Sequence, residues 1–304
     1  MLILVNWVNT AILSAAFMAG VNILDSHLVS KRMPSLRAFL LPVSAVHLMY
    51  AFLLFTLFPL PEGTDTWPVL AAVASGVLRT AAAIIMLDSL KREEVSRVVP
   101  IVYAYPIFVA IMAVPLLGES LGWLEWLAIV IVVSGAVMVS MGQSPSGSIV
   151  WHGKLLLLFG CGLLFAMADI ASKYALAYIS FWNMFCISAF CMSSIFLLVS
   201  IRPGIIRQLI SMEQKSSAIG LLVLDETLVV IGIVLSFWAL ERGPVSLVAT
   251  IVGSRPMFVL IFTIVLSRLL PTFLKWHFSK RMLALRLVAT AMVVGGITII
   301  QLCG

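Results

Sequence analysis

Ionisable side chains interrupt several long apolar runs of the sequence. Arg79, the adjacent Asp225 and Glu226, and Arg255 all lie among apolar and small residues. A charged group in hydrocarbon is costly unless it is paired or hydrated, which makes such residues candidates for a functional site. Guanidinium groups bind carboxylates and phosphates well, and a buried carboxyl group can carry a proton. We therefore expect Arg79 and Arg255 to hold an anion, and Asp225 or Glu226 to position the arginines or carry a coupling proton.

A structural interpretation of the same charges remains open. Arg79 and the pair Asp225 and Glu226 would then form a buried ion pair that fixes helix packing. Asp169 and Lys173 are four residues apart in another apolar run. At that spacing two side chains share one helix face, so we expect these two to pair with each other.

Polar and aromatic residues in the same runs supply further candidates for a substrate site. They are Tyr103, Tyr105, Trp238, Asn22 and His47. Tyr105 is the strongest of them, because it directly precedes Pro106 just as Arg255 directly precedes Pro256.

The composition requires that these residues sit in lipid. Of 304 residues, 62% are apolar and 11% are charged, whereas soluble domains carry about 25% charged residues. A membrane-spanning helix needs about 20 apolar residues, so the chain has room for ten helices and no sizeable soluble domain. We predict an all-α integral membrane protein with ten transmembrane helices.

Apolar runs bounded by proline, glycine and charge define the expected spans. They are residues 7–29, 36–58, 67–87, 95–117, 123–141, 155–178, 181–201, 217–238, 245–266 and 282–302.

The basic residues predict the orientation of these spans. Of the 19 Lys and Arg, 15 follow the first, third, fifth, seventh and ninth spans, whereas only Lys173 and Arg242 fall on the opposite side. Basic loops stay in the cytoplasm. We therefore expect both termini outside the cytoplasm and the protein in the cytoplasmic membrane.

The chain contains an internal repeat. Residues 90–111 and 240–261 align at a shift of 150 positions with 11 identities in 22 pairs, including Pro106 with Pro256. We predict a first repeat at 1–142, a linker at 143–150 and a second repeat at 151–304, with a basic interfacial insert at 268–286. Because five spans make an odd number, the second repeat enters the membrane from the opposite side. The two repeats should therefore be inverted.

The repeated prolines mark helix breaks near a binding site. Pro106 and Pro256 each remove a backbone hydrogen bond inside a span and expose carbonyls that a neighbouring helix or a wet cavity must satisfy. Paired interruptions in corresponding helices of two halves are typical of a central transport site.

Several motifs together resemble the EamA-type branch of the drug/metabolite transporter superfamily. They are the five-plus-five pattern, Pro106, the run Leu117-Gly118-Glu119-Ser120-Leu121, and a span ending in Gly135-Ala136-Val137. The second half departs from this pattern, with Ser267 and Arg268 in place of the Gly-Glu pair. The resemblance implies a ten-helix transporter of small metabolites.

We therefore expect a transporter that moves a small, anionic metabolite by alternating access through a central cavity. The alternative is a flippase for an anionic lipid of the polyprenyl-phosphate type, favoured by the arginines and the basic insert. A membrane-embedded enzyme is a remote alternative, because phosphate-loop, His-Glu-x-x-His and CxxC motifs are absent from the sequence. We expect no metal, no cofactor other than a coupling proton, and no nucleic-acid partner.

Overall fold

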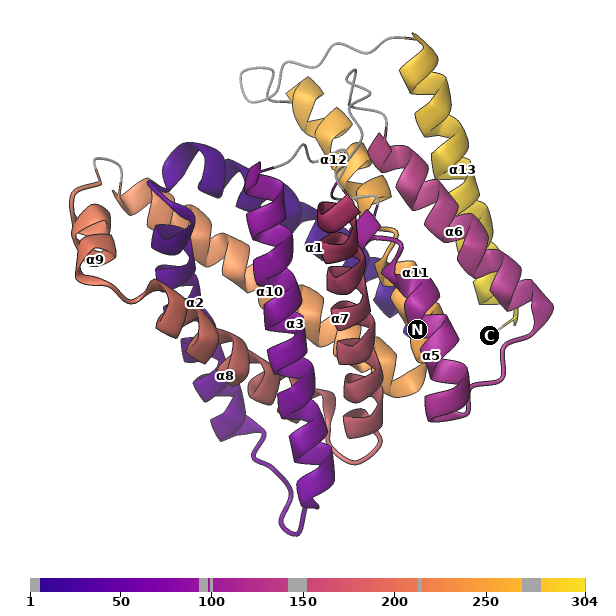
Figure 1. The fold of residues 1–304 in the computed structure, drawn as a ribbon, viewed down its shortest axis with the longest axis horizontal. Coiled ribbons are helices and arrows are strands. Elements are labelled where there is room, and N and C mark those ends of the chain that lie inside the picture. The colour runs from indigo at the N-terminus through magenta and orange to yellow at the C-terminus, as the bar shows by residue number, and fades with distance from the viewer. Residues whose placement is uncertain are drawn as a thin grey trace.

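The structure is a bundle of helices (Figure 1). This computed structural model describes residues 6–92, 98, 101–141, 152–212, 215–269 and 280–303. Every regular element within these ranges is helical, so the all-α prediction is confirmed.

Nine helices of the described ranges are long and apolar enough to cross a membrane. They are α1 (Trp7–His27), α2 (Leu36–Leu57), α3 (Thr66–Arg92), α6 (Trp123–Met141), α7 (His152–Leu176), α8 (Phe181–Ser200), α10 (Lys215–Arg242), the broken helix formed by α11 (Val245–Val252) and α12 (Arg255–Leu269), and α13 (Lys280–Cys303). A shorter apolar helix, α5 (Tyr105–Leu117), forms the second part of the predicted span 95–117. Much of the first part of that span lies outside the described residues.

Local signals in the sequence explain where several helices begin and end. The Oγ of Ser35 accepts a hydrogen bond from the backbone N–H of Ala38, and Ser180 caps α8 in the same way. Such caps satisfy amide groups that have no partner within the helix. Gly118 ends α5 in the left-handed conformation, with φ of 69°, which glycine adopts without steric cost.

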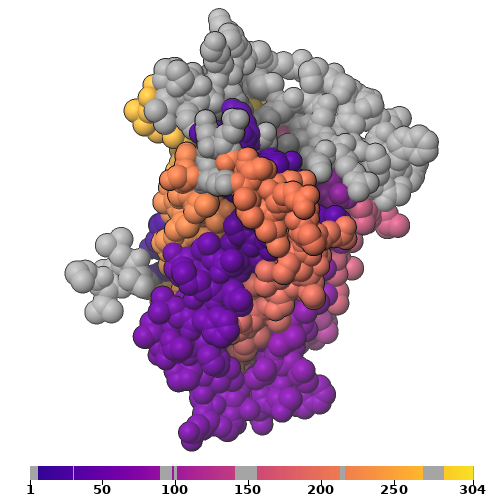
Figure 2. Space-filling view, turned by 90° about the vertical axis from the view of Figure 1, so that its left-hand side faces the viewer, coloured from indigo at the N-terminus to yellow at the C-terminus, as the bar shows by residue number. Residues whose placement is uncertain are grey.

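Two short elements were not predicted from the sequence. A π-helical turn, η2 (Leu28–Arg32), extends α1, and α9 (Pro203–Ile210) forms a short surface helix after α8. Figure 2 shows the side of the molecule on which α9 packs near α2. Ser35, just before α2, donates a hydrogen bond to the side chain of Gln208 on α9 at 3.3 Å.

The core is built from helices of both predicted repeats. Helix α1 packs against α10, α3 against α7, α2 against α8, α6 against α13, and α5 against α11. Each pair combines one helix from the first half of the chain with one from the second. The predicted linker 143–150 lies outside the described residues.

Small residues allow close approach between α6 and α13. A Cβ on Gly135 would lie 2.8 Å from the backbone oxygen of Ala289, and one on Gly296 would lie 2.5 Å from Val132 Cγ2. Helices in lipid associate through such small-residue contacts, because lipid provides no hydrophobic driving force between them.

One interhelical contact recurs in the two halves at matching positions. The Oγ of Ser14 on α1 donates to the backbone oxygen of Gly232 on α10 at 2.7 Å. The Sγ of Cys161 on α7 donates to the backbone oxygen of Ala82 on α3 at 3.2 Å. Cys161 lies 147 positions after Ser14, and Gly232 lies 150 positions after Ala82. Helix α7 therefore meets α3 in the same register as α1 meets α10.

Candidate functional site

The predicted helix breaks have the same local geometry in the two halves. Backbone amides of Ala104 and Ile107 donate to the oxygens of Ile101 and Ala104, three residues earlier in each case. Ser254 and Met257 make the equivalent bonds, to Ile251 and Ser254, exactly one repeat shift later in the chain. Each turn ends one α-helical stretch and starts another, which begins at Tyr105 or at Arg255.

The two breaks lie against each other. A Cβ on Gly253, in the turn between α11 and α12, would lie 2.9 Å from the ring of Pro106. The sequence predicted kinks at the prolines, whereas the structure shows full interruptions placed just before them. Pro106 and Pro256 occupy the first turns of the new helices, where the missing amide proton costs nothing.

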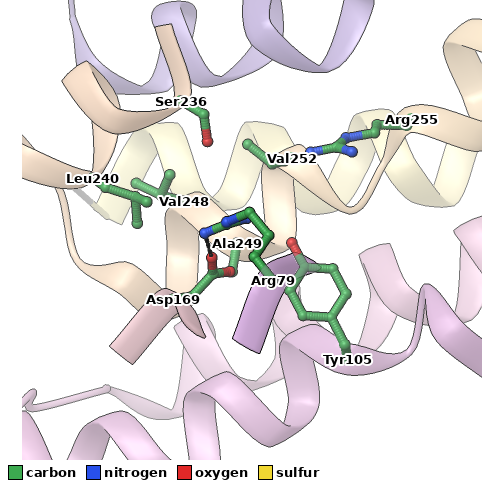
Figure 3. A pocket seen from close by; sticks show the side chains of 9 residues that line it. All are labelled: Arg79, Tyr105, Asp169, Ser236, Leu240, Val248, Ala249, Val252 and Arg255. Carbon is green, nitrogen blue, oxygen red and sulfur yellow. Dashed lines mark hydrogen bonds and ion pairs between the residues drawn. The ribbon is translucent and has the colours of Figure 1, made fainter. Parts of the chain in front are cut away.

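A small cavity lies beside these breaks (Figure 3). Its lining residues come from α3, α5, α7, α10, α11 and α12: Arg79, Tyr105, Asp169, Ser236, Leu240, Val248, Ala249, Val252 and Arg255. Its volume is about 10 Å³, room for about one water molecule. The structure thus brings together Arg79, Tyr105 and Arg255, which the sequence proposed as substrate-binding residues.

Arg79 is paired with Asp169 across the α3–α7 interface. Its Nη2 donates to Asp169 Oδ1 at 2.7 Å, and the side chains are 26% and 7% exposed. The guanidinium also lies 5.6 Å from the ring centre of Phe237. The expectation that Asp225 or Glu226 would pair with an arginine is wrong for Arg79. Its carboxylate partner comes from α7, because that helix packs directly against α3.

Arg255 enters the cavity from the first residue of α12. Its Nε is buried and has no hydrogen-bond partner among the described residues. Tyr105, at the equivalent position of the other half, lines the same cavity (Figure 3). Among its described lining residues, the cavity therefore holds two guanidinium groups against one carboxylate.

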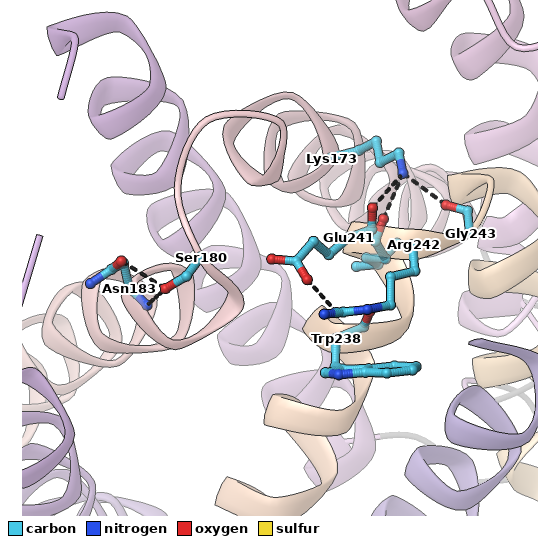
Figure 4. Close-up of polar contacts among 8 residues, drawn as sticks. Lys173, Ser180, Asn183, Trp238, Glu241, Arg242 and Gly243 are labelled. Atoms are coloured by element: carbon cyan, nitrogen blue, oxygen red, sulfur yellow. Dashed lines mark hydrogen bonds and ion pairs between the residues drawn. The ribbon is translucent and has the colours of Figure 1, made fainter. Parts of the chain in front are cut away.

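Lys173 does not pair with Asp169, contrary to the prediction. Its Nζ donates instead to the backbone oxygens of Leu240, at 2.7 Å, and of Gly243, at 2.8 Å (Figure 4). Carbonyls at a helix C-terminus lack partners within the helix and carry partial negative charge. Lys173 therefore caps the end of α10 rather than neutralising Asp169.

Glu119 binds the beginning of α11, the helix that follows α10. Its carboxylate accepts hydrogen bonds from the backbone N–H of Val245 at 2.5 Å and from the Oγ of Ser246 at 2.5 Å. These groups belong to the first turn of α11, where a negative charge is stabilised by the free amides. The Gly-Glu motif noted in the sequence thus positions the broken helix that carries the cavity lining.

Glu226 binds a histidine in a second polar cluster. The Nδ1 of His47 on α2 lies 2.7 Å from Glu226 Oε2, and both side chains are buried. His47 and Arg79 line a second cavity, of about 20 Å³, together with Phe185 and Phe237. The second cluster and the first cavity are therefore joined through Arg79, which lines both cavities.

Asp225 is fully buried and faces α1. Neither of its carboxylate oxygens has a hydrogen-bond donor among the described residues. Its carboxyl group lies within hydrogen-bonding reach of that of Asp25. Sequence reasoning missed Asp25, although the residue is an acid inside the predicted span 7–29, a signal as strong as the one that selected Asp225.

Of the five further candidates from the sequence, Tyr105 lines the first cavity, whereas Tyr103, Trp238, Asn22 and His47 do not. The hydroxyl of Tyr103 accepts a hydrogen bond from Asn22 Nδ2 at 3.0 Å. Trp238 lies beneath Arg242, whose guanidinium carbon is 4.1 Å from its ring centre (Figure 4). Tyr103 therefore links α1 to the first helix break, and Trp238 packs with a cation near the end of α10.

Comparison with known proteins agrees with the two-part organisation. The sequence profile of the EamA-like transporter family matches residues 6–141 and 153–284. One solved structure, a crystal structure of a protein, superposes with a TM-score of 0.68 at 16% sequence identity and covers 98% of this chain and 96% of that one. At this identity the likeness shows a shared fold alone. No curated protein matches the chain.

Proposed function

The chain belongs to the EamA-like transporter family, and from this premise we propose that it moves a small, anionic metabolite across the membrane. The family assignment confirms the resemblance found in the sequence and supports a transporter rather than an enzyme. The substrate class rests on one observation: Arg255, whose Nε is buried without a hydrogen-bond partner among the described residues, lines the same cavity as Tyr105 and the Arg79–Asp169 pair.

The charge of the cavity favours an anion. Asp169 neutralises Arg79, whereas Arg255 has no ion pair within the described residues. A partly buried guanidinium without a counter-ion is a good site for a carboxylate or phosphate, because it can make two parallel hydrogen bonds to either group. Tyr105 adds a hydroxyl that can donate to the same group.

We propose that transport proceeds by alternating access between two inverted five-helix repeats, with ten spans in all. The recurring Ser14 and Cys161 contacts and the matched breaks at 104 and 254 support this symmetry. The cavity of about 10 Å³ is too small for a metabolite. Substrate entry therefore requires the helices around the breaks to move, and the interrupted backbone provides natural hinges.

The flippase alternative depends on the basic insert at 268–286, most of which lies outside the described residues. At its two described ends, Arg268 is exposed, whereas Arg286 is 2% exposed and engaged in contacts within the protein. We keep the water-soluble substrate as the first proposal, because the resemblance implies a transporter of small metabolites.

Substrate screening tests the proposed function. Purified protein should show raised thermal unfolding midpoints with anionic metabolites and not with cationic ones, in a panel of amino acids, nucleotide sugars and polyprenyl phosphates. The compounds that stabilise it should then support counterflow in proteoliposomes, where external labelled substrate exchanges with an unlabelled internal pool. Stabilisation and exchange by cations alone would overturn the assignment, and selective movement of polyprenyl phosphates would establish the flippase.

The proposed orientation yields a separate prediction. We propose that both termini lie outside the cytoplasm, because 15 basic residues follow the odd-numbered spans. A reporter that is active only in the cytoplasm should therefore be silent when fused after Gly304. The same reporter inserted at residue 145, in the segment after the fifth span, should be active. Strong activity at the C-terminus with silence at residue 145 would reverse the orientation.

A further inference from the structure

The crossing of α1 and α10 holds two carboxyl groups in contact. Asp25 on α1 and Asp225 on α10 lie within hydrogen-bonding reach, and Asp225 is completely buried. Both oxygens of Asp225 lack a donor among the described residues. Two ionised carboxylates offer only acceptors, so a hydrogen bond between these groups requires that one of them hold a proton.

At the matching position of the α3–α7 crossing in the other half, both side chains are uncharged. Ser75 on α3 and Ser172 on α7 bond through their hydroxyls at 2.7 Å, and both are buried. Asp225 lies 150 positions after Ser75, and Ser172 lies 147 positions after Asp25. These are the shifts that relate the Ser14 and Cys161 contacts. Two hydroxyls therefore suffice to join helices at this position, and packing alone does not explain two acids.

The side chains around Asp25 and Asp225 add negative charge and do not neutralise the pair. Glu226, next on α10, is the one further charged group that acts on the pair from the described parts of the helices packed around it. His47 on α2 binds Glu226. Farther along α1, His27 faces Lys31 and Arg32 of η2. Within the described residues, the pair thus has an acid beside it and no arginine or lysine in direct contact.

We propose that Asp25 and Asp225 together bind one exchangeable proton, and that this proton is coupled to movement of the anionic substrate. The coupling rests on the transport function proposed above. Binding takes one proton from water on one side of the membrane, and release returns it to water on the other, so no redox or covalent step is involved. A monovalent anion that moves with one proton crosses the membrane without net charge.

A series of contacts connects the acid pair to the cavity lined by Arg79 and Arg255. Asp225 adjoins Glu226, Glu226 binds His47, and His47 lines the second cavity together with Arg79. Arg79 in turn holds Asp169 in the substrate cavity. A change in the charge of the acid pair therefore acts on the arginine that lines both cavities.

Proton binding can be measured without knowing the substrate. Besides the absorption of the other Asp and Glu side chains that titrate, infrared difference spectra of the purified protein between acidic and alkaline buffer should show a distinct protonated carboxyl band of the buried pair that disappears as pH rises. The variant Asp25→Ser/Asp225→Ser copies the residues of the matching crossing, so it should fold and lose this band. Ser75→Ala/Ser172→Ala is the matched control and should keep it. The proton site would be overturned if the band persists in Asp25→Ser/Asp225→Ser. It would also be overturned if added sodium removes the band of the wild-type protein at constant pH.

Coupling is tested in proteoliposomes with a substrate identified by counterflow. One-to-one movement with a proton across one pH unit supports about tenfold accumulation. The wild-type protein should reach this ratio, and Asp25→Ser/Asp225→Ser should show no accumulation. Wild-type counterflow without any effect of the pH gradient would overturn the coupling and leave the transport function standing. Absence of wild-type counterflow with every anion would instead refute the transport function.

Discussion

Replacing Arg255 by lysine is expected to weaken the binding of an anionic substrate by about 1 to 3 kcal/mol while the protein still folds. Lysine keeps the positive charge but loses the planar fork that makes two parallel hydrogen bonds to a carboxylate or phosphate. The Nε of Arg255 is already buried without a partner, so its contribution to folding through hydrogen bonding is small. Isothermal titration with the best compound of the screen measures the loss.

Arg242→Lys is the matched control for this change. Arg242 lies over Trp238 at the end of α10 and does not line the substrate cavity. Its replacement should leave affinity within experimental error. Normal affinity and transport in Arg255→Lys, accompanied only by a lower unfolding temperature, would identify Arg255 as a packing residue and remove the anionic-substrate proposal.

The membrane-spanning elements could be predicted because hydrocarbon imposes a simple rule on the sequence. Apolar runs of about 20 residues must become helices in lipid, since each backbone group needs a partner within its own segment. The prediction of span 123–141 matches α6 at both ends. The short helix α9 was missed because eight residues with two basic side chains nearby do not form an apolar run.

The repeat in the sequence also located the candidate site. Tyr105 and Arg255 precede the repeated prolines, and the structure places both on one cavity. The position of each break could not be predicted, because proline specifies where a new helix can start and not where the previous one ends. Gly253 ends α11 where its bare Cα meets Pro106, a contact between distant segments that no local pattern reveals.

The charge partners could not be deduced from spacing. Asp169 and Lys173 have ideal spacing for a pair on one helix face, yet each binds a group on another element. Contacts between helices depend on how each helix is rotated about its axis, and the sequence carries little information on this when nearly every face is apolar. For the same reason, the contact of Glu226 with His47 could not be predicted from the sequence.

Removing the charge of Arg79 alone is expected to have the largest effect on stability. In Arg79→Gln the buried carboxylate of Asp169 loses its counter-ion. Breaking a buried pair in this way costs about 3 to 5 kcal/mol, and we expect about 2 to 4 kcal/mol because Arg79 is 26% exposed. Reversible unfolding in mixed micelles measures the change. Arg242→Gln, which breaks the more exposed pair with Glu241, should cost at most about 1 kcal/mol.

The double variant Arg79→Gln/Asp169→Asn separates stability from transport. Two neutral amides can hydrogen-bond across the α3–α7 interface and leave no charge unpaired, so most of the lost stability should return. Transport should remain defective, because the cavity has lost a charged group that we propose as a contact of the substrate. If the free energies of the single variants simply add in the double variant, the two side chains do not interact. If the double variant is stable and transports normally, the pair fixes helix packing and takes no part in recognising the substrate.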